Sequence, residues 1–138
     1  MPLVSFPSGL EPPLTITGGS IMDLNAAIKA HGDWKLKLRG AIQSKEKLDA
    51  ATISVDNQCP LGKWLHSEAK DKYGKLASYK NCVTKHADFH KCAGNVAKTV
   101  NAGKYPEAEA MLGANSEYMN ASTAVAIAIG ALKKEAGI

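Results

Sequence analysis

The chain has 138 residues, of which 45% are hydrophobic, so it has the size and apolar content of one globular domain that needs no disulfide framework. Its 17 Lys and Arg and 13 Asp and Glu give a net charge of +4, but the charges are scattered and no basic run indicates nucleic-acid binding. The chain has three cysteines and no leading secretory pattern, which favours a reducing, cytoplasmic compartment. Its longest apolar stretch, residues 121–132, is too short to span a membrane.

Proline and glycine are concentrated in residues 1–20, where they interrupt helical structure. We therefore expect an N-terminal arm or linker followed by a helical domain over residues 21–138. A first helix is predicted over residues 21–44, because apolar positions recur there at spacings of three, four and seven. Ser20 followed by Asp23 resembles a capping box for this helix, with Asp in place of the usual Glu.

Residues 45–58 form a polar stretch with several β-branched side chains, so we expect a connection that contains at most a short helical turn. Pro60 is typical of the first position of a helix, which places Cys59 at or just before the N-terminus of a short helix. At that position the helix dipole favours the thiolate form of cysteine.

Two further helices are predicted in the second half of the chain. The first runs over about residues 78–102 and ends at Gly103, and the last opens at residues 104–106 and continues through Leu132. No segment shows a convincing strand alternation. The chain is therefore predicted to be all-α, as an antiparallel four-helix-type bundle with an additional short helix that carries the cysteine.

The histidines provide the strongest functional signal. His86 and His90, written HADFH, project from one face of the second long helix, which is metal-ligand geometry, although the pair alone also fits a solvated or hydrogen-bonded face. His31 lies on the apolar stripe of the first helix, where a core histidine bonded to a neighbouring helix is the alternative. Cys59 taken alone also fits a small buried hydrophobic residue. His66 has polar neighbours and is assigned to the surface.

Taken together, these residues predict a metal site. Antiparallel helices can bring His31 opposite His86 and His90, and Cys59 can supply the fourth corner. Three imidazole nitrogens and one thiolate suit tetrahedral Zn²⁺. Four protein ligands leave no position for a substrate and no HExxH base accompanies the pair, which disfavours a zinc hydrolase and indicates that the protein is not an enzyme. A sensor is favoured, with a structural zinc-stabilised scaffold or dimerisation module as the alternative.

The three cysteines are expected to differ in reactivity. Cys82 lies one turn before His86 on the apolar side of the same helix and is assigned to the core. Cys92 is rotated away from the histidines and is assigned to a partly exposed position. Cys59 is the expected redox-sensitive residue, because a thiolate is the form of cysteine that oxidises.

Three segments together resemble a known family. The histidine in AIKAHGDWKLKLRGAI, the segment CPLGKW and the histidine pair in HADFHKCAGNVA occur in the order found in the bacterial chemoreceptor zinc-binding domain, often called CZB. The resemblance covers nearly the whole chain from Asp23 onward. It implies that His31, Cys59, His86 and His90 are the zinc ligands.

The resemblance also carries expectations about function. It implies a cytoplasmic helical bundle that binds zinc tightly, commonly forms a homodimer and is usually attached to chemoreceptors or diguanylate cyclases. For some members it implies sensing of hypochlorite or a similar oxidant. The expected role is therefore control of chemotaxis or of cyclic-di-GMP signalling, without membrane insertion or nucleic-acid binding. No receptor coiled coil and no cyclase domain accompany the segment here, so both a stand-alone protein and a fragment remain open.

Overall fold

The computed structural model describes residues 22–138, which contain seven helices and no strand. The helices are α1 (Leu24–Ser44), α2 (Ala50–Ser54), α3 (Pro60–Leu65), α4 (Glu68–Tyr73), α5 (Ala77–Asn101), α6 (Tyr105–Met111) and α7 (Glu117–Ala136). The all-α architecture expected from the sequence is confirmed. The arm expected over residues 1–20 lies outside the described residues.

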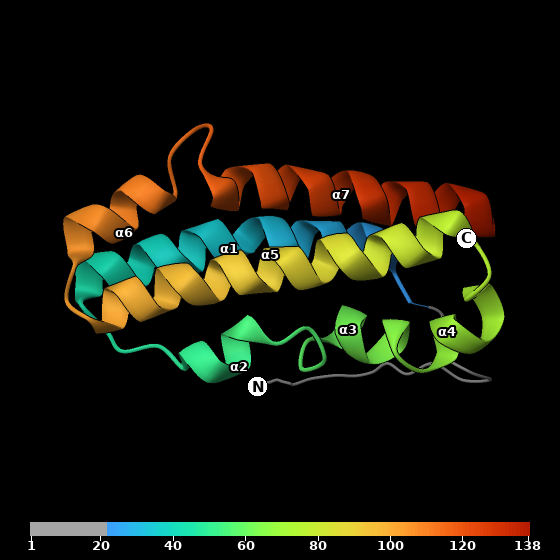
Figure 1. The fold of residues 1–138 in the computed structure, drawn as a ribbon, viewed down its shortest axis with the longest axis horizontal. Helices are drawn as coiled ribbons and strands as arrows, with labels where there is room; N and C mark the ends of the chain where they lie inside the picture. Colours follow the sequence, from blue (N-terminus) through green and yellow to red (C-terminus); the bar gives the residue numbers. More distant parts are fainter. Residues whose placement is uncertain (1–21) are drawn as a thin grey trace.

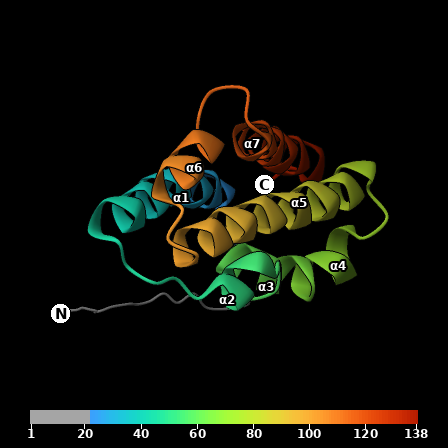
Figure 2. The ribbon, with the colours of Figure 1, turned by 60° about the vertical axis from the view of Figure 1, so that its left-hand side comes forward.

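Three long helices and a row of short ones make up the bundle (Figure 1). Helices α1, α5 and α7 lie along one common direction, and α2, α3 and α4 follow one another along the remaining side of α5. We call these three the short-helix row. The chain reverses direction from α1 to the short-helix row, again to α5 and again to α7, as in an up-down-up-down bundle (Figures 1 and 2). The short helix that follows the cysteine is thus part of the fourth position of the bundle.

Helix α1 is capped by Asp23, whose carboxylate accepts a hydrogen bond from the backbone N–H of Ala26 at 3.0 Å. This bond satisfies one of the free N–H groups at the helix start. The predicted capping box, in which Ser20 would be the cap, is therefore wrong. The helix ends where Lys45 adopts a left-handed conformation with φ 58° and its N–H returns to the carbonyl of Ala41.

The single last helix predicted over residues 104–132 is also wrong, because the chain forms two helices there, α6 and α7. Helix α6 ends at Met111, and Asn115 in the following loop adopts φ 66°, a left-handed conformation that is not helical. The Ser116 side chain then accepts the N–H of Met119 at 3.1 Å and caps α7. The apolar spacing continues across this break, which explains why periodicity alone predicted one helix.

The start of α5 is capped by a residue of α7. Leu76, the residue before α5, has no polar side chain to offer to the free N–H groups. The Glu135 carboxylate accepts a hydrogen bond from the N–H of Ser78 at 3.1 Å and a second one from the Ser78 hydroxyl. The negative charge of Glu135 also lies favourably at the positive end of the α5 dipole.

The linker between α1 and α2 is fastened to the end of α5 by Asn101. The N–H of Leu48 donates to Asn101 Oδ1 at 2.8 Å, and Asn101 Nδ2 donates to the carbonyl of Leu48 at 2.8 Å. Lys47 adds a bond from Nζ to the backbone oxygen of Asn101 at 2.9 Å. The Asn101 side-chain amide thus accepts from the N–H and donates to the carbonyl of Leu48, the same two bonds that a neighbouring backbone segment would make.

The core runs along the centre of the bundle and holds the short-helix row against α5. Its fully buried large side chains include Leu38, Leu65, Phe89, Val96, Leu112, Ile129 and Leu132. The end of α3 is held by Tyr79 of α5, whose hydroxyl donates to the carbonyl of Leu65 at 2.6 Å in a buried position. None of the helices within residues 22–138 has both the length and the apolar character needed to cross a membrane.

Candidate metal centre

Three structural elements bring the predicted donor residues to one place. His31 lies on α1, His86 and His90 lie one turn apart on α5, and Cys59 is the residue that caps α3. Their nitrogen and sulfur donor atoms all lie within 4.8 Å of one another. The four residues are therefore close enough to coordinate one metal ion, as the sequence predicted.

The donor atoms face one another directly. His86 Nε2 lies 3.1 Å from His31 Nε2 and 3.1 Å from His90 Nε2. Cys59 Sγ lies 3.8 Å from His31 Nε2, 3.2 Å from His86 Nε2 and 3.5 Å from His90 Nε2. Each histidine thus presents its Nε2 atom to a common centre.

These separations match the edges of a zinc coordination shell. A tetrahedral ion with Zn–N distances of about 2.05 Å and Zn–S of about 2.3 Å has N···N edges of about 3.3 Å and N···S edges of about 3.6 Å. The five donor-to-donor distances given above lie between 3.1 Å and 3.8 Å, so each is within a few tenths of an ångström of the corresponding edge. Three imidazoles and one thiolate are also the donor types that zinc accepts.

Backbone carbonyls orient two of the three rings. His31 Nδ1 donates to the carbonyl of Ala27 at 2.7 Å, and His90 Nδ1 donates to the carbonyl of Ile53 in α2 at 3.0 Å. A proton on Nδ1 leaves the lone pair on Nε2, which is the atom at the common centre. His86 Nδ1 is buried and has no hydrogen-bond partner among the described residues. The rings of His31 and His90 are therefore oriented to bind a cation through Nε2.

The histidines lie in the protein interior and are held neutral. His31, His86 and His90 have exposed fractions of 4%, 0% and 3%. Burial lowers the pKa of His31 and His90 below the ordinary 6.5, and the carbonyl bond of each ring partly offsets the shift. His86 has no such bond, and burial together with the neighbouring imidazoles lowers its pKa to about 3. Neutral imidazole is the form that binds a metal.

Cys59 differs from the histidines because it is only partly buried. It caps α3 as predicted, with Pro60 in the first turn, and its Sγ accepts the N–H of Gly62 at 3.4 Å. Burial nevertheless raises the pKa of its thiol above 9.0, and the backbone N–H groups only partly oppose this shift. The expected stabilisation of the thiolate by the helix terminus alone is thus outweighed, and a cation is needed to hold the sulfur deprotonated.

Two glycines allow the short-helix row to approach the centre, and the atoms that they meet were not predictable from local sequence. A Cβ on Gly62 would overlap the carbonyl oxygen of Asp56 and lie 3.1 Å from His86 Cε1. A Cβ on Gly94 of α5 would overlap the side chain of Ser54, which belongs to α2. At Gly62 the helix backbone lies against another backbone segment, and at Gly94 it lies against a side chain, in each case at a distance that only glycine permits.

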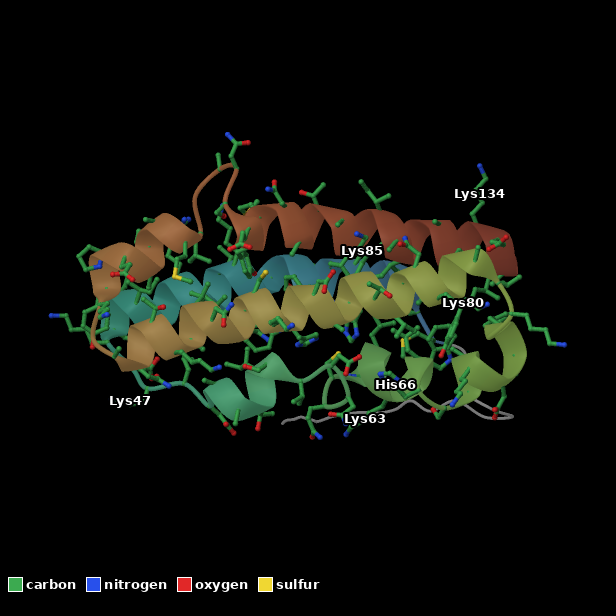
Figure 3. The ribbon with its side chains drawn as sticks, in the orientation of Figure 1. Lys47, Lys63, His66, Lys80, Lys85 and Lys134 are labelled. Atoms are coloured by element: carbon green, nitrogen blue, oxygen red, sulfur yellow. The ribbon has the colours of Figure 1, made fainter. Side chains whose placement is uncertain are left out.

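The remaining candidate residues lie outside the centre. His66 is exposed, and its Nε2 pairs with the Asp56 carboxylate at 2.9 Å. Figure 3 shows His66 on the short-helix row. Cys82 is fully buried and Cys92 is partly exposed, as expected. Trp34 is half-buried and packs against the core cluster.

Comparison with known proteins agrees with this geometry. Residues 31–97 match the family model described as the chemoreceptor zinc-binding domain. Searches of the curated proteins and of the solved structures gave no match. The matched segment begins at His31 and includes Cys59, His86 and His90, so all four converging donors lie inside it. Residues 31–97 are thus similar to the chemoreceptor zinc-binding domain family, and this match together with the four converging donors supports a zinc-binding signalling domain.

Proposed function

We propose that the chain is a regulatory sensor in which His31, Cys59, His86 and His90 hold one Zn²⁺ ion and Cys59 responds to oxidants. The observation that carries this proposal is the convergence of three Nε2 atoms and one Sγ atom, all within 4.8 Å of one another. Zinc bound there would supply a positive charge that keeps the cysteine sulfur as a thiolate, without redox chemistry of its own.

The four donors have unequal freedom to move. His86 and His90 are fixed by the packing of the 25-residue helix α5, and His31 by the 21-residue helix α1. Cys59 caps a helix of six residues and is the partly exposed member of the set. Oxidation of its sulfur removes electron density that the metal needs, so we expect the Cys59 end of α3 to separate from the histidines.

The proposed output is control of a cytoplasmic signalling partner of the chemoreceptor or diguanylate cyclase type, and hence of chemotaxis or cyclic-di-GMP signalling. The description of the matching family supports the chemoreceptor setting. A homodimer is proposed as the working state. Leu36 on α1 and Ile127 on α7 support it, because these large apolar side chains are 67% and 68% exposed.

Native mass spectrometry of protein purified without added metal tests the zinc set and the chain count together. We expect one zinc per chain in the unaltered protein and a large loss of zinc in Cys59→Ala. Cys92→Ala is the matched control, because Cys92 is also partly exposed but lies outside the donor group, and it should keep its zinc. Equal zinc content in both variants would contradict the assigned ligand set.

A second experiment separates a sensor from a scaffold. The buried histidines also suit a zinc ion that only holds the fold, since the three rings lie inside the core. Zinc is removed with a chelator while helical content and chain count are followed. A folded metal-free state with a changed chain count supports the sensor, whereas complete unfolding supports the scaffold. Mild hypochlorous acid should modify Cys59 before Cys82 and Cys92, and preferential modification of Cys92 would contradict oxidant sensing.

A further inference from the structure

A cavity of about 380 Å³ lies beside the metal centre, between α1 and the start of α3. His31 and Cys59 form part of its wall, together with Trp34 and Leu61. Cavities that admit small molecules begin at about this size. Of the four donor residues, these two alone line the cavity within the described part of the chain, whereas His86 and His90 do not.

The exposed fractions of the four donor residues also indicate that the metal centre is accessible from the side of the cavity. The three histidines are at most 4% exposed, whereas Cys59 is partly exposed. The opposite sides of the donor group are covered by α5, by α2 and by the close contact at Gly62. A reagent in solution therefore reaches the sulfur from the cavity, where Cys59 forms part of the wall.

The wall of this cavity is mainly apolar. Its apolar lining includes Trp34, Leu61 and the small side chains of Ala26 and Ala30. Its charged members are Lys37 and Asp23. Lys37 Nζ lies 4.8 Å above the Trp34 ring, and the Asp23 carboxylate is engaged by the N–H of Ala26. An apolar wall with two opposite charges that already have partners favours an uncharged reactant over an anion.

We propose that this cavity is the entry route by which small, uncharged oxidants reach Cys59, and that Ala26 and Ala30 keep it open. The inference rests on the proposed oxidant response and adds a route and a class of reactant to it. With hypochlorous acid as the oxidant, the sulfur attacks chlorine and hydroxide leaves, and water then replaces chloride. The net change is RS⁻ + HOCl → RSOH + Cl⁻, in which sulfur loses two electrons and chlorine gains two.

Filling the cavity tests the route. Ala30→Trp and Ala26→Trp place a large ring at an exposed helical position that lines the cavity. Ala131→Trp is the matched control, because Ala131 is exposed on α7 and does not line it. Each zinc-loaded protein is treated with a limiting amount of hypochlorous acid, and oxidation of Cys59 and of Cys92 is measured by peptide mass spectrometry. Cys92 serves as an internal reference for reagent concentration.

We expect the ratio of Cys59 to Cys92 oxidation to fall about fivefold or more in each cavity-filling variant, since thiol oxidation follows access, and to stay unchanged in Ala131→Trp. Zinc content, measured in parallel, should stay at one ion per chain. An unchanged ratio in the zinc-loaded variants would overturn the route. If Cys59 of the unaltered protein is not oxidised at all, the proposed oxidant response fails instead, so the two failures are distinguishable.

The charge preference has its own test. Iodoacetamide and iodoacetate are close in size, but only iodoacetate is charged. In the unaltered protein, the ratio of Cys59 to Cys92 alkylation should be higher for iodoacetamide than for iodoacetate. Trp34→Ala widens the cavity and should raise Cys59 alkylation by a bulky maleimide relative to Cys92. Equal ratios for the two small reagents would overturn the preference for uncharged reactants.

Discussion

Gly62 of α3 lies directly against the backbone carbonyl of Asp56, and the His86 ring packs on the same side of the glycine. The glycine is thus enclosed between a loop and a donor residue. The loop carbonyl belongs to the backbone and cannot rotate away as a flexible side chain would. The spacing between α3 and the metal centre therefore depends on the absence of a side chain at this position.

Gly62→Ala should separate α3 from the Asp56 loop. We expect it to lower the free energy of unfolding by about 1–3 kcal/mol, as overpacking does, and to weaken zinc binding about tenfold or more. Gly40→Ala is the control, because a Cβ on Gly40 of α1 meets nothing within 4 Å, and it should stabilise the helix by up to about 1 kcal/mol. Urea unfolding and zinc competition measure both effects, and a neutral Gly62→Ala would contradict the packing argument.

Zinc binding near pH 7 should release about one proton per chain. The low pKa values of the three histidines mean that the rings are already neutral, whereas burial keeps the Cys59 thiol protonated. Binding must therefore remove one proton, and the apparent affinity should fall about tenfold for each pH unit below neutrality. Calorimetry in two buffers of different ionisation enthalpy counts the proton. A release of two or more protons would contradict neutral histidines.

Glu135 should stabilise the protein in a pH-dependent way. Its hydrogen bonds to Ser78 lower its pKa below the ordinary 4.5, so the folded state holds the charged form more firmly than the unfolded state does. This contribution is fully present above the unfolded pKa and is lost as the pH falls through the folded pKa. Glu135→Gln should therefore lower the Tm at pH 7, with a difference that disappears in acid.

Thermal unfolding of Glu135→Gln from pH 7 to pH 3 checks this expectation. Glu107→Gln serves as the control, since Glu107 is exposed on α6 and has no partner in α5. A Tm difference for Glu135→Gln that is the same at both pH values would show that the carboxylate charge plays no part.

Asn101→Ala should destabilise the connection between α1 and α2. The substitution removes both hydrogen bonds between the Asn101 amide and Leu48, which are partly buried. We expect a loss of about 1–3 kcal/mol in the free energy of unfolding, from two bonds of about 1 kcal/mol each and partly desolvated groups left unpaired. Asn101→Asp should also destabilise the protein, because its carboxylate still accepts the Leu48 N–H but places its second oxygen against the Leu48 carbonyl. Equal stability of Asn101→Ala and the unaltered protein in urea would contradict the stabilising role of the Asn101–Leu48 hydrogen bonds.

Local sequence signals located the four residues whose potential donor atoms converge in the structure. The spacing of His86 and His90 on a helix, and Pro60 immediately after Cys59, each depend on only a few neighbouring residues. For that reason the helix face and the helix start were predictable without knowledge of the fold. The same reasoning predicted that an antiparallel arrangement could bring His31 to the pair, and the structure has these residues together.

The parts that depend on contacts between distant elements were not predictable in this way. No local pattern indicates that the carbonyl of Ile53 orients His90, because the contact exists only once α2 packs on α5. The break between α6 and α7 was missed because the apolar period continues through it. The presence of asparagine at position 115 was the usable signal, since asparagine adopts the left-handed conformation found there more readily than most residues.

The bond from Tyr79 to the carbonyl of Leu65 gives α3 a second attachment, at the end opposite to Cys59. When one end of a short, rigid helix is released while the other end stays attached, the helix rotates about the attached end. In the proposed oxidant response, in which the Cys59 end separates from the histidines, Tyr79 would be the point about which α3, with six residues and a length of about 9 Å, rotates. Tyr79→Phe removes this attachment while leaving the four converging donor residues unaltered, and in the proposed response it would change how far and in which direction α3 can rotate.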